Sequence, residues 1–167
     1  CFWIKFSEIA RVDDRGLDAI FIDGGEAEAL RRFLNDEAHA DTVLAACCDL
    51  DAEKANRYQR QFGFAKAYTD LETMLRRERP DAVCLIVNEH HTCDVACAVL
   101  QQGCPLLMEK PPGMTVSETD RMIDVTAKTG APTQVAFNRR YIPLLQQARA
   151  LLTAPEFSGN LQHVHYD

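Results

Sequence analysis

The sequence predicts an α/β fold built on a doubly wound parallel sheet. From Leu17 onward, short apolar runs alternate with amphipathic segments, and this alternation is typical of βαβ units. The run 82–87 is almost entirely apolar, as expected for a central strand covered by helices on both faces. A second run, 105–108, stops at Glu109 and Lys110, and two prolines follow that cannot continue a strand ladder because they lack an N–H.

Composition restricts the class of protein. The 167 residues suit one ordinary domain, and a net charge of −7 without a Lys/Arg cluster argues against a nucleic-acid partner. No apolar run approaches the roughly 20 residues of a membrane span, and no signal peptide opens the chain. The seven cysteines lie mostly inside apolar runs, where they behave as small hydrophobes rather than as a disulfide framework. We therefore expect a cytoplasmic protein without a membrane or nucleic-acid partner.

The first strand and its turn are the place where a dinucleotide fold carries glycines. We predict a strand at 19–22, a turn at Gly24 and Gly25, and a helix at 26–35. The pattern G-x-G-x-x-G/A is incomplete, because Ile22 stands at the first glycine position. Two interpretations stay open for this turn, a phosphate-binding loop and an ordinary tight turn.

Two acidic residues follow the second predicted strand, 42–48. Asp49 lies where a carboxylate accepts hydrogen bonds from the adenosine ribose in dinucleotide folds. The alternative is that Asp49 or Asp51 caps the next helix, 52–62. One of them can cap while the other stays free. A carboxylate here would repel a 2′-phosphate, which favours NAD over NADP.

The remaining helices and strands are predicted from the spacing of apolar residues, from helix-capping residues, and from glycines and prolines that end an element. A helix begins after Thr69 or Asp70, and the helix after 113 begins near Thr115 or Ser117, with Ser117 and Asp120 resembling a capping box. The other predicted strands are 65–68, 82–87, 105–108, 133–137 and a last one at 161–166, and the other predicted helices are 71–79, 92–102, 115–128 and 143–153.

Three predicted strand ends carry polar clusters, and ligands bind beyond the carboxyl ends of parallel strands. These clusters are 88–91, Glu109 with Lys110, and Asn138 with Arg139. Lys110 is the first candidate for chemistry, because a lysine there can be held near a reacting hydroxyl. The alternative for Lys110 is a salt bridge to Glu109.

Several motifs occur together in order. Residues 109–111 read E-K-P, Cys48 and Asp49 put an acid after the second strand, residues 68–70 read Y-T-D, and residues 137–141 read F-N-R-R-Y. In these motifs the chain resembles the glucose–fructose oxidoreductase/inositol dehydrogenase family, Gfo/Idh/MocA. The resemblance implies a Rossmann domain followed by an α/β domain, an NAD(H) or NADP(H) cofactor, and sugars, polyols or related alcohols as substrates. It also implies that Lys110 binds the reacting hydroxyl and assists proton transfer while a hydride passes to the nicotinamide.

The chain departs from the family pattern at two places. Where the family commonly has T-P-x-H, residues 87–90 read V-N-E-H, so only His90 is retained. The Asp and His that the family's second domain supplies do not occur before the chain ends, and His163 and His165 are not that motif.

The leading hypothesis is the cofactor-binding portion of an NAD-dependent oxidoreductase, with 1–16 unassigned, 17–140 as the Rossmann domain, and 141–167 as the start of a truncated second α/β domain. Lys110 is the catalytic candidate, and the full-length protein is a possible homo-oligomer. The cofactor-binding candidates are Gly24, Gly25, Asp49, Asn88, His90, Glu109 and Arg139.

Two other hypotheses come from different classes. The incomplete glycine pattern favours a non-catalytic Rossmann module that senses a nucleotide or acts as a scaffold. The helical spacing of His90, Cys93 and Cys97 would suit a zinc site, although no fourth ligand is evident and such a face is more often core. We therefore expect no metal.

Overall fold

The computed structural model describes residues 17–23, 42–137 and 142–155, with backbone only for 17–23 and residue 42. The chain divides into two compact units, Lys5–Ala136 and a second that combines Cys1–Ile4 with Phe137–Asp167. The predicted helix 26–35, the turn glycines Gly24 and Gly25, Arg139 and the last strand lie outside the described residues.

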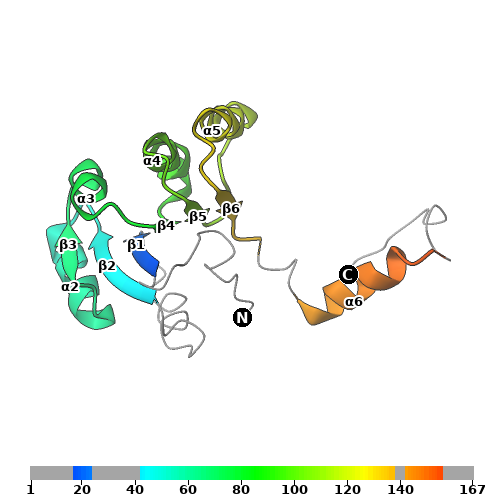
Figure 1. Cartoon of the computed structure of the whole chain (residues 1–167), viewed down its shortest axis with the longest axis horizontal. Helices are drawn as coiled ribbons and strands as arrows, with labels where there is room; N and C mark the ends of the chain where they lie inside the picture. Colours follow the sequence, from blue (N-terminus) through cyan, green and yellow to red (C-terminus); the bar gives the residue numbers. More distant parts are fainter. Residues whose placement is uncertain (1–16, 24–41, 138–141, 156–167) are drawn as a thin grey trace. The chain divides into compact units, whose positions relative to one another are not determined.

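The larger unit contains a six-stranded sheet in which every pair of neighbours is parallel (Figure 1). The strand order is β3-β2-β1-β4-β5-β6, which is the order of the Rossmann fold. The strands are β1 Leu17–Asp23, β2 Thr42–Cys48, β3 Lys66–Tyr68, β4 Ala82–Ile86, β5 Leu106–Met108 and β6 Thr133–Val135. The predicted fold class is confirmed.

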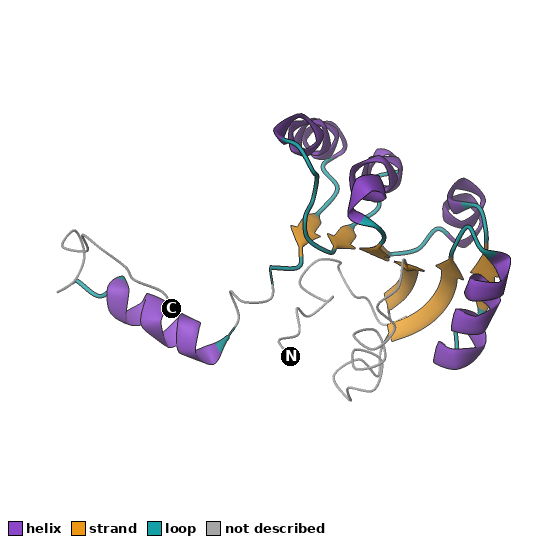
Figure 2. Cartoon of the chain, turned by 180° about the vertical axis from the view of Figure 1, so that it is seen from behind, coloured by secondary structure: helices purple, strands orange, loops and turns teal. Residues whose placement is uncertain are grey.

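Helices cover the two faces of this sheet. The helix α2, Ala52–Phe62, lies on one face, and three helices lie side by side along the other (Figures 1 and 2). Those three are α3 Leu71–Glu78, α4 Glu89–Gln101 and α5 Val116–Thr129. The sheet is therefore wound on both faces. A further helix, α6 Pro143–Leu152, belongs to the smaller unit.

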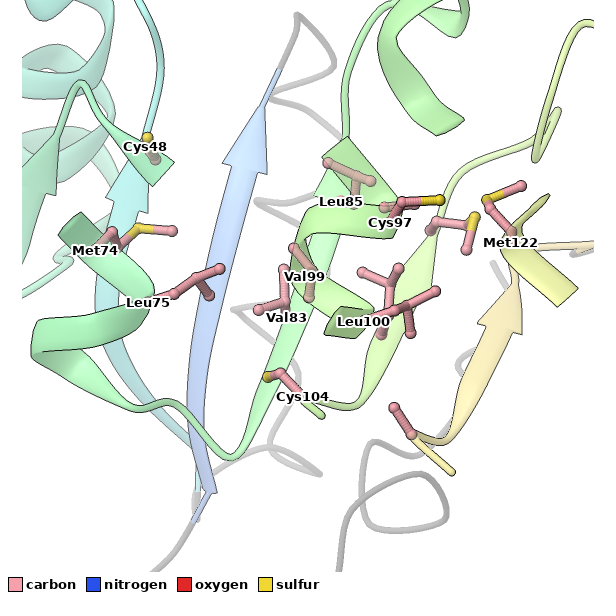
Figure 3. Close-up of a cluster of buried hydrophobic side chains, with 14 of the residues drawn as sticks. Cys48, Met74, Leu75, Val83, Leu85, Cys97, Val99, Leu100, Cys104 and Met122 are labelled. Carbon is pink, nitrogen blue, oxygen red and sulfur yellow. The ribbon is translucent and has the colours of Figure 1, made fainter. Parts of the chain in front are cut away.

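Each face has its own apolar core. The larger core joins α3, α4 and α5 to β2, β4 and β5, with Met74, Leu85, Leu100 and Leu106 almost fully buried (Figure 3). The smaller core packs Tyr58 of α2 on the opposite face. Each fully buried side chain of this size contributes about 1.5–3 kcal/mol through removal of apolar surface from water.

One predicted helix start and one predicted capping box were wrong. The helix α4 begins at Glu89 rather than Thr92, because the Asn88 side chain accepts the His90 N–H at 3.1 Å and caps a polar first turn that carries no apolar period. The capping box of α5 pairs Thr115 with Glu118 rather than Ser117 with Asp120.

Two predicted strands extend beyond the C-terminal ends that the structure shows. The strand β4 ends at Ile86 and β6 ends at Val135, whereas the sequence pattern continued each of them. Within the described ranges, no helix has both the length and the apolar character needed to cross a membrane.

Candidate functional site

The carboxyl ends of the strands lie at one level along the sheet. At this level Tyr68 of β3 pairs with Cys48 of β2, which pairs with Ile22 of β1. Ile22 in turn pairs with Leu85 of β4, Leu85 with Met108 of β5, and Met108 with Val135 of β6. The register continues one residue further, because the N–H groups of Asp49 and Glu109 donate to Tyr68 O at 3.1 Å and Leu85 O at 3.0 Å. Asp49 and Glu109 therefore occupy equivalent places just beyond β2 and β5.

The strand order reverses direction between β1 and β4, and this topological switch point is where Rossmann folds bind dinucleotides. Asp49 follows β2 on one side of it, and Glu109 and Lys110 follow β5 on the other. Three strand spacings separate β2 from β5, or about 14 Å at about 4.8 Å each. The two groups thus lie on opposite sides of the switch point.

Asp49 is half-buried, and its orientation is fixed by the turn that follows it. Its Oδ1 accepts the backbone N–H of Asp51 at 2.8 Å. Asp51 performs the capping, since its Oδ1 accepts the N–H groups of Glu53 and Lys54 at 2.9 and 3.3 Å. The choice that the sequence left open is resolved: Asp51 caps α2, and among the described residues Asp49 Oδ2 accepts no hydrogen bond.

This end of the sheet has a negative electrostatic environment. Burial, together with the carboxylates of Asp70 and Asp49, raises the pKa of the Cys48 thiol to about 11. Asp70 caps α3 by accepting the Thr73 N–H at 2.8 Å, and hydrogen bonds from Thr73 lower the pKa of Asp70. Two carboxylates therefore act on the same point at the end of β2.

Lys110 is exposed at the opposite side of the switch point, and the Lys110–Pro111 peptide bond is cis. The Glu109 carboxylate accepts the backbone N–H of Lys110 at 3.0 Å. Among the residues that the structure describes, no carboxylate lies in ion-pair contact with the Lys110 ammonium. The predicted alternative of a Glu109–Lys110 salt bridge is wrong.

Asn88 and His90 lie at the end of β4, as predicted, but the Asn88 side-chain oxygen already caps α4. His90 is exposed in the first turn of that helix. Their assignment to cofactor binding stays a prediction, as do those of Gly24, Gly25 and Arg139.

The metal hypothesis finds no support. Within the described ranges, no three His, Cys, Asp or Glu side chains gather as a metal site would require. Cys93 instead donates to Glu118 O at 3.2 Å and accepts from Arg121 Nη2 at 3.0 Å, between α4 and α5. Burial raises the pKa of its neighbour Cys97.

Sequence reasoning missed Glu118. Its carboxylate accepts the N–H groups of Met114 and Thr115 at 2.6 and 3.2 Å, directly after the segment that carries Lys110. The signal was present as T-x-x-E at 115–118, but the predicted capping box lay two residues later.

Comparison with known families adds to this geometry. Residues 23–137 match the Gfo/Idh/MocA family, described as an oxidoreductase family with an NAD-binding Rossmann fold. The chain belongs to this family. The match covers β2 to β6 and the last residue of β1, and it confirms the predicted family and its NAD-binding Rossmann domain.

Two of the curated relatives are a glucoside dehydrogenase and an inositol dehydrogenase. D-glucoside 3-dehydrogenase of Escherichia coli is 29% identical over 113 residues, which cover 68% of this chain and 32% of that enzyme. Myo-inositol 2-dehydrogenase of Thermotoga maritima is 30% identical over 103 residues, covering 60% and 30%. The chain therefore spans about a third of the length of these curated relatives.

Solved structures agree with the fold. An NAD binding oxidoreductase from Klebsiella pneumoniae superimposes with a TM-score of 0.71 at 25% identity, covering 82% of this chain and 38% of that one. The WlbA dehydrogenase from Bordetella pertussis, solved with NADH and UDP-GlcNAcA, gives a TM-score of 0.73 at 19% identity, covering 83% and 42%. The second likeness concerns the fold alone.

Proposed function

We propose that this chain is the cofactor-binding portion of an NAD-dependent dehydrogenase that acts on a hydroxyl group of a sugar, polyol or related alcohol. The observation that carries the proposal is the placement of Asp49 and Lys110 just beyond β2 and β5, on opposite sides of the switch point. Binding and chemistry are thereby assigned to the two halves of one crevice.

The residues at the end of β2 fit an adenosine ribose. Asp49 has one oxygen fixed by the Asp51 N–H and a second oxygen that can accept from ribose hydroxyls. The nearby Asp70 carboxylate adds negative charge, which opposes a 2′-phosphate and supports NAD over NADP. The Gly24–Gly25 turn would let the pyrophosphate approach the backbone. Asn88, His90, Glu109 and Arg139 complete the proposed cofactor contacts.

Lys110 is proposed to act on the substrate oxygen. Bound nicotinamide would supply the acceptor for a hydride. The Lys110 amine would hydrogen-bond the substrate hydroxyl and receive its proton during oxidation, then return a proton in the reverse direction. The exposed position of Lys110, with its amino group outside any ion pair in the described part of the chain, would let the neutral amine reach the substrate hydroxyl.

The names of the relatives support the substrate class. They include a D-glucoside dehydrogenase and inositol dehydrogenases, whose names specify polyhydroxylated substrates. The full-length protein is proposed to be a cytoplasmic homo-oligomer, and the described cysteines from Cys47 to Cys104, which are buried and outside any disulfide, suit a reducing compartment.

The test begins with titrations of the protein with NADH and with NADPH, in which binding is monitored through nicotinamide fluorescence. We expect saturable binding that prefers NADH. In the full-length protein, a screen of sugars and polyols with NAD should yield turnover that Lys110→Ala abolishes without changing cofactor binding.

Full activity in the Lys110→Ala variant would refute the catalytic assignment. Absence of binding to either cofactor would refute the dehydrogenase proposal and would instead favour the scaffold hypothesis.

A further inference from the structure

The segment that carries Lys110 joins β5 to α5 and runs from Glu109 to Thr115. Its start is attached to the sheet, because the Glu109 N–H donates to Leu85 O at 3.0 Å. Its end is attached to α5 through the Glu118 carboxylate, whose Oε2 accepts the N–H of Met114 at 2.6 Å and that of Thr115 at 3.2 Å. Glu118 thus binds the segment four residues after Lys110.

Little freedom remains between these two attachments. Pro111 and Pro112 have fixed φ angles, and the residue before each proline is itself restricted. Gly113 lies directly against α5, since an added Cβ would lie 2.9 Å from Glu118 Cβ and 3.2 Å from the Thr119 N. The segment therefore rests on Glu118 through van der Waals contact as well as through hydrogen bonds.

Glu118 is itself held in place from two sides. Its N–H donates to Thr115 Oγ1 at 3.2 Å, which completes the capping box of α5. Its carbonyl oxygen accepts the Cys93 thiol of α4 at 3.2 Å. Arg121, one turn along α5, donates to the same sulfur at 3.0 Å and pairs with Asp94. The helix that holds the Lys110 segment is thus tied to the helix that begins at the end of β4.

We propose that Glu118 is a positioning residue that fixes the backbone on which Lys110 approaches the substrate. The inference rests on the proposed function, since it assigns to Glu118 no contact with substrate or cofactor. A displacement of about 1 Å in a reacting group costs about 100-fold in rate. Loss of the two Glu118 hydrogen bonds acts on turnover and leaves the ribose site at β2 unchanged.

Three variants separate positioning from stability. Glu118→Ala removes the acceptor, whereas Glu118→Gln keeps a side-chain oxygen and a permitted capping-box residue. The matched control is Glu78→Ala on α3, which removes hydrogen bonds to Lys66 and Tyr68 outside the Lys110 segment. The melting temperature of each variant places the two alanine variants on one stability scale.

The first measurement is hydrogen–deuterium exchange of the purified protein, and it needs no substrate. We expect Glu118→Ala to accelerate exchange at Met114 and Thr115, Glu118→Gln to retain most of the protection, and Glu78→Ala to leave it unchanged. Unchanged exchange in Glu118→Ala would overturn the inference, because the carboxylate would then not hold the segment.

The second measurement is turnover of the full-length protein with a substrate from the sugar and polyol screen. We expect Glu118→Ala to lower kcat by about 10- to 100-fold with NADH affinity unchanged, and Glu118→Gln to restore most of it. A kcat that falls no further than in Glu78→Ala would overturn the inference. Full activity in Lys110→Ala would instead mark failure of the proposed function, so the two failures are distinguishable.

Discussion

The carboxylate of Asp49 offers a direct test of the cofactor site, through Asp49→Asn. One of its oxygens is used by the Asp51 N–H, which leaves the other for the ribose. Asparagine keeps an acceptor for that N–H but loses the charge. Hydrogen bonds to charged groups contribute about 1.5–3 kcal/mol, so NADH binding should weaken by about 10- to 150-fold, with about 1.4 kcal/mol per factor of ten.

The matched control is Asp51→Asn. Asn caps helices about as well as Asp. This variant therefore loses one negative charge two residues further along the chain and preserves the start of α2. We expect its NADH affinity to stay close to that of the unmodified protein. NADPH affinity should rise in Asp49→Asn, because a carboxylate that repels the 2′-phosphate has been removed.

Nicotinamide fluorescence titrations of both variants with NADH and NADPH provide the assay. An equal loss of NADH affinity in the two variants would refute the ribose assignment, since the effect would then reflect general charge or the turn itself. An unchanged affinity in Asp49→Asn would refute it as well.

Three further predictions concern stability. Leu100→Ala empties a fully buried position in the larger core, so the free energy of unfolding in urea should fall by about 2–5 kcal/mol; a fall below 1 kcal/mol would contradict close packing there. Gly113→Ala forces a Cβ to 2.9 Å from Glu118 Cβ, so differential scanning calorimetry should show a destabilisation of about 1–3 kcal/mol, and an unchanged melting temperature would contradict it. Burial and the nearby Asp81 raise the pKa of the Cys104 thiol from 9.0 to about 12. Because the unfolded chain then releases this proton first, stability should be complete below about pH 9 and should decline as pH rises toward about 12. Urea titrations at pH 8 and pH 10.5 should show a smaller alkaline loss in Cys104→Ala, and equal losses would count against this assignment.

Much of the sheet was predictable because apolar runs mark buried strands. The strand β2 and the helix α2 have the predicted bounds, since Asp51 and Gly63 punctuate that helix with a cap and a left-handed turn. Lys110 and Asp49 lie at strand ends for the same reason: an abrupt change from apolar to charged residues coincides with the edge of the sheet.

Features that depend on spatial contacts could not be predicted. Whether Asp49 or Asp51 caps α2 depends on backbone orientation, which apolar spacing does not specify. The first turn of α4 was missed because Glu89, His90 and His91 are all polar, and the helix was predicted from the spacing of apolar residues. The role of Glu118 depends on a segment that folds back against its side chain. The sequence shows a glycine at 113, but only the folded structure shows how closely that glycine approaches Glu118.

The two edge strands of the sheet have a consequence for association between chains. β3 and β6 are three residues each, so either edge exposes few unpaired backbone groups to another strand. Short edges, with a charged residue such as Lys66 on β3, discourage edge-to-edge pairing and aggregation. Self-assembly through continuation of this sheet is therefore disfavoured, and a family member that forms oligomers would do so through another surface.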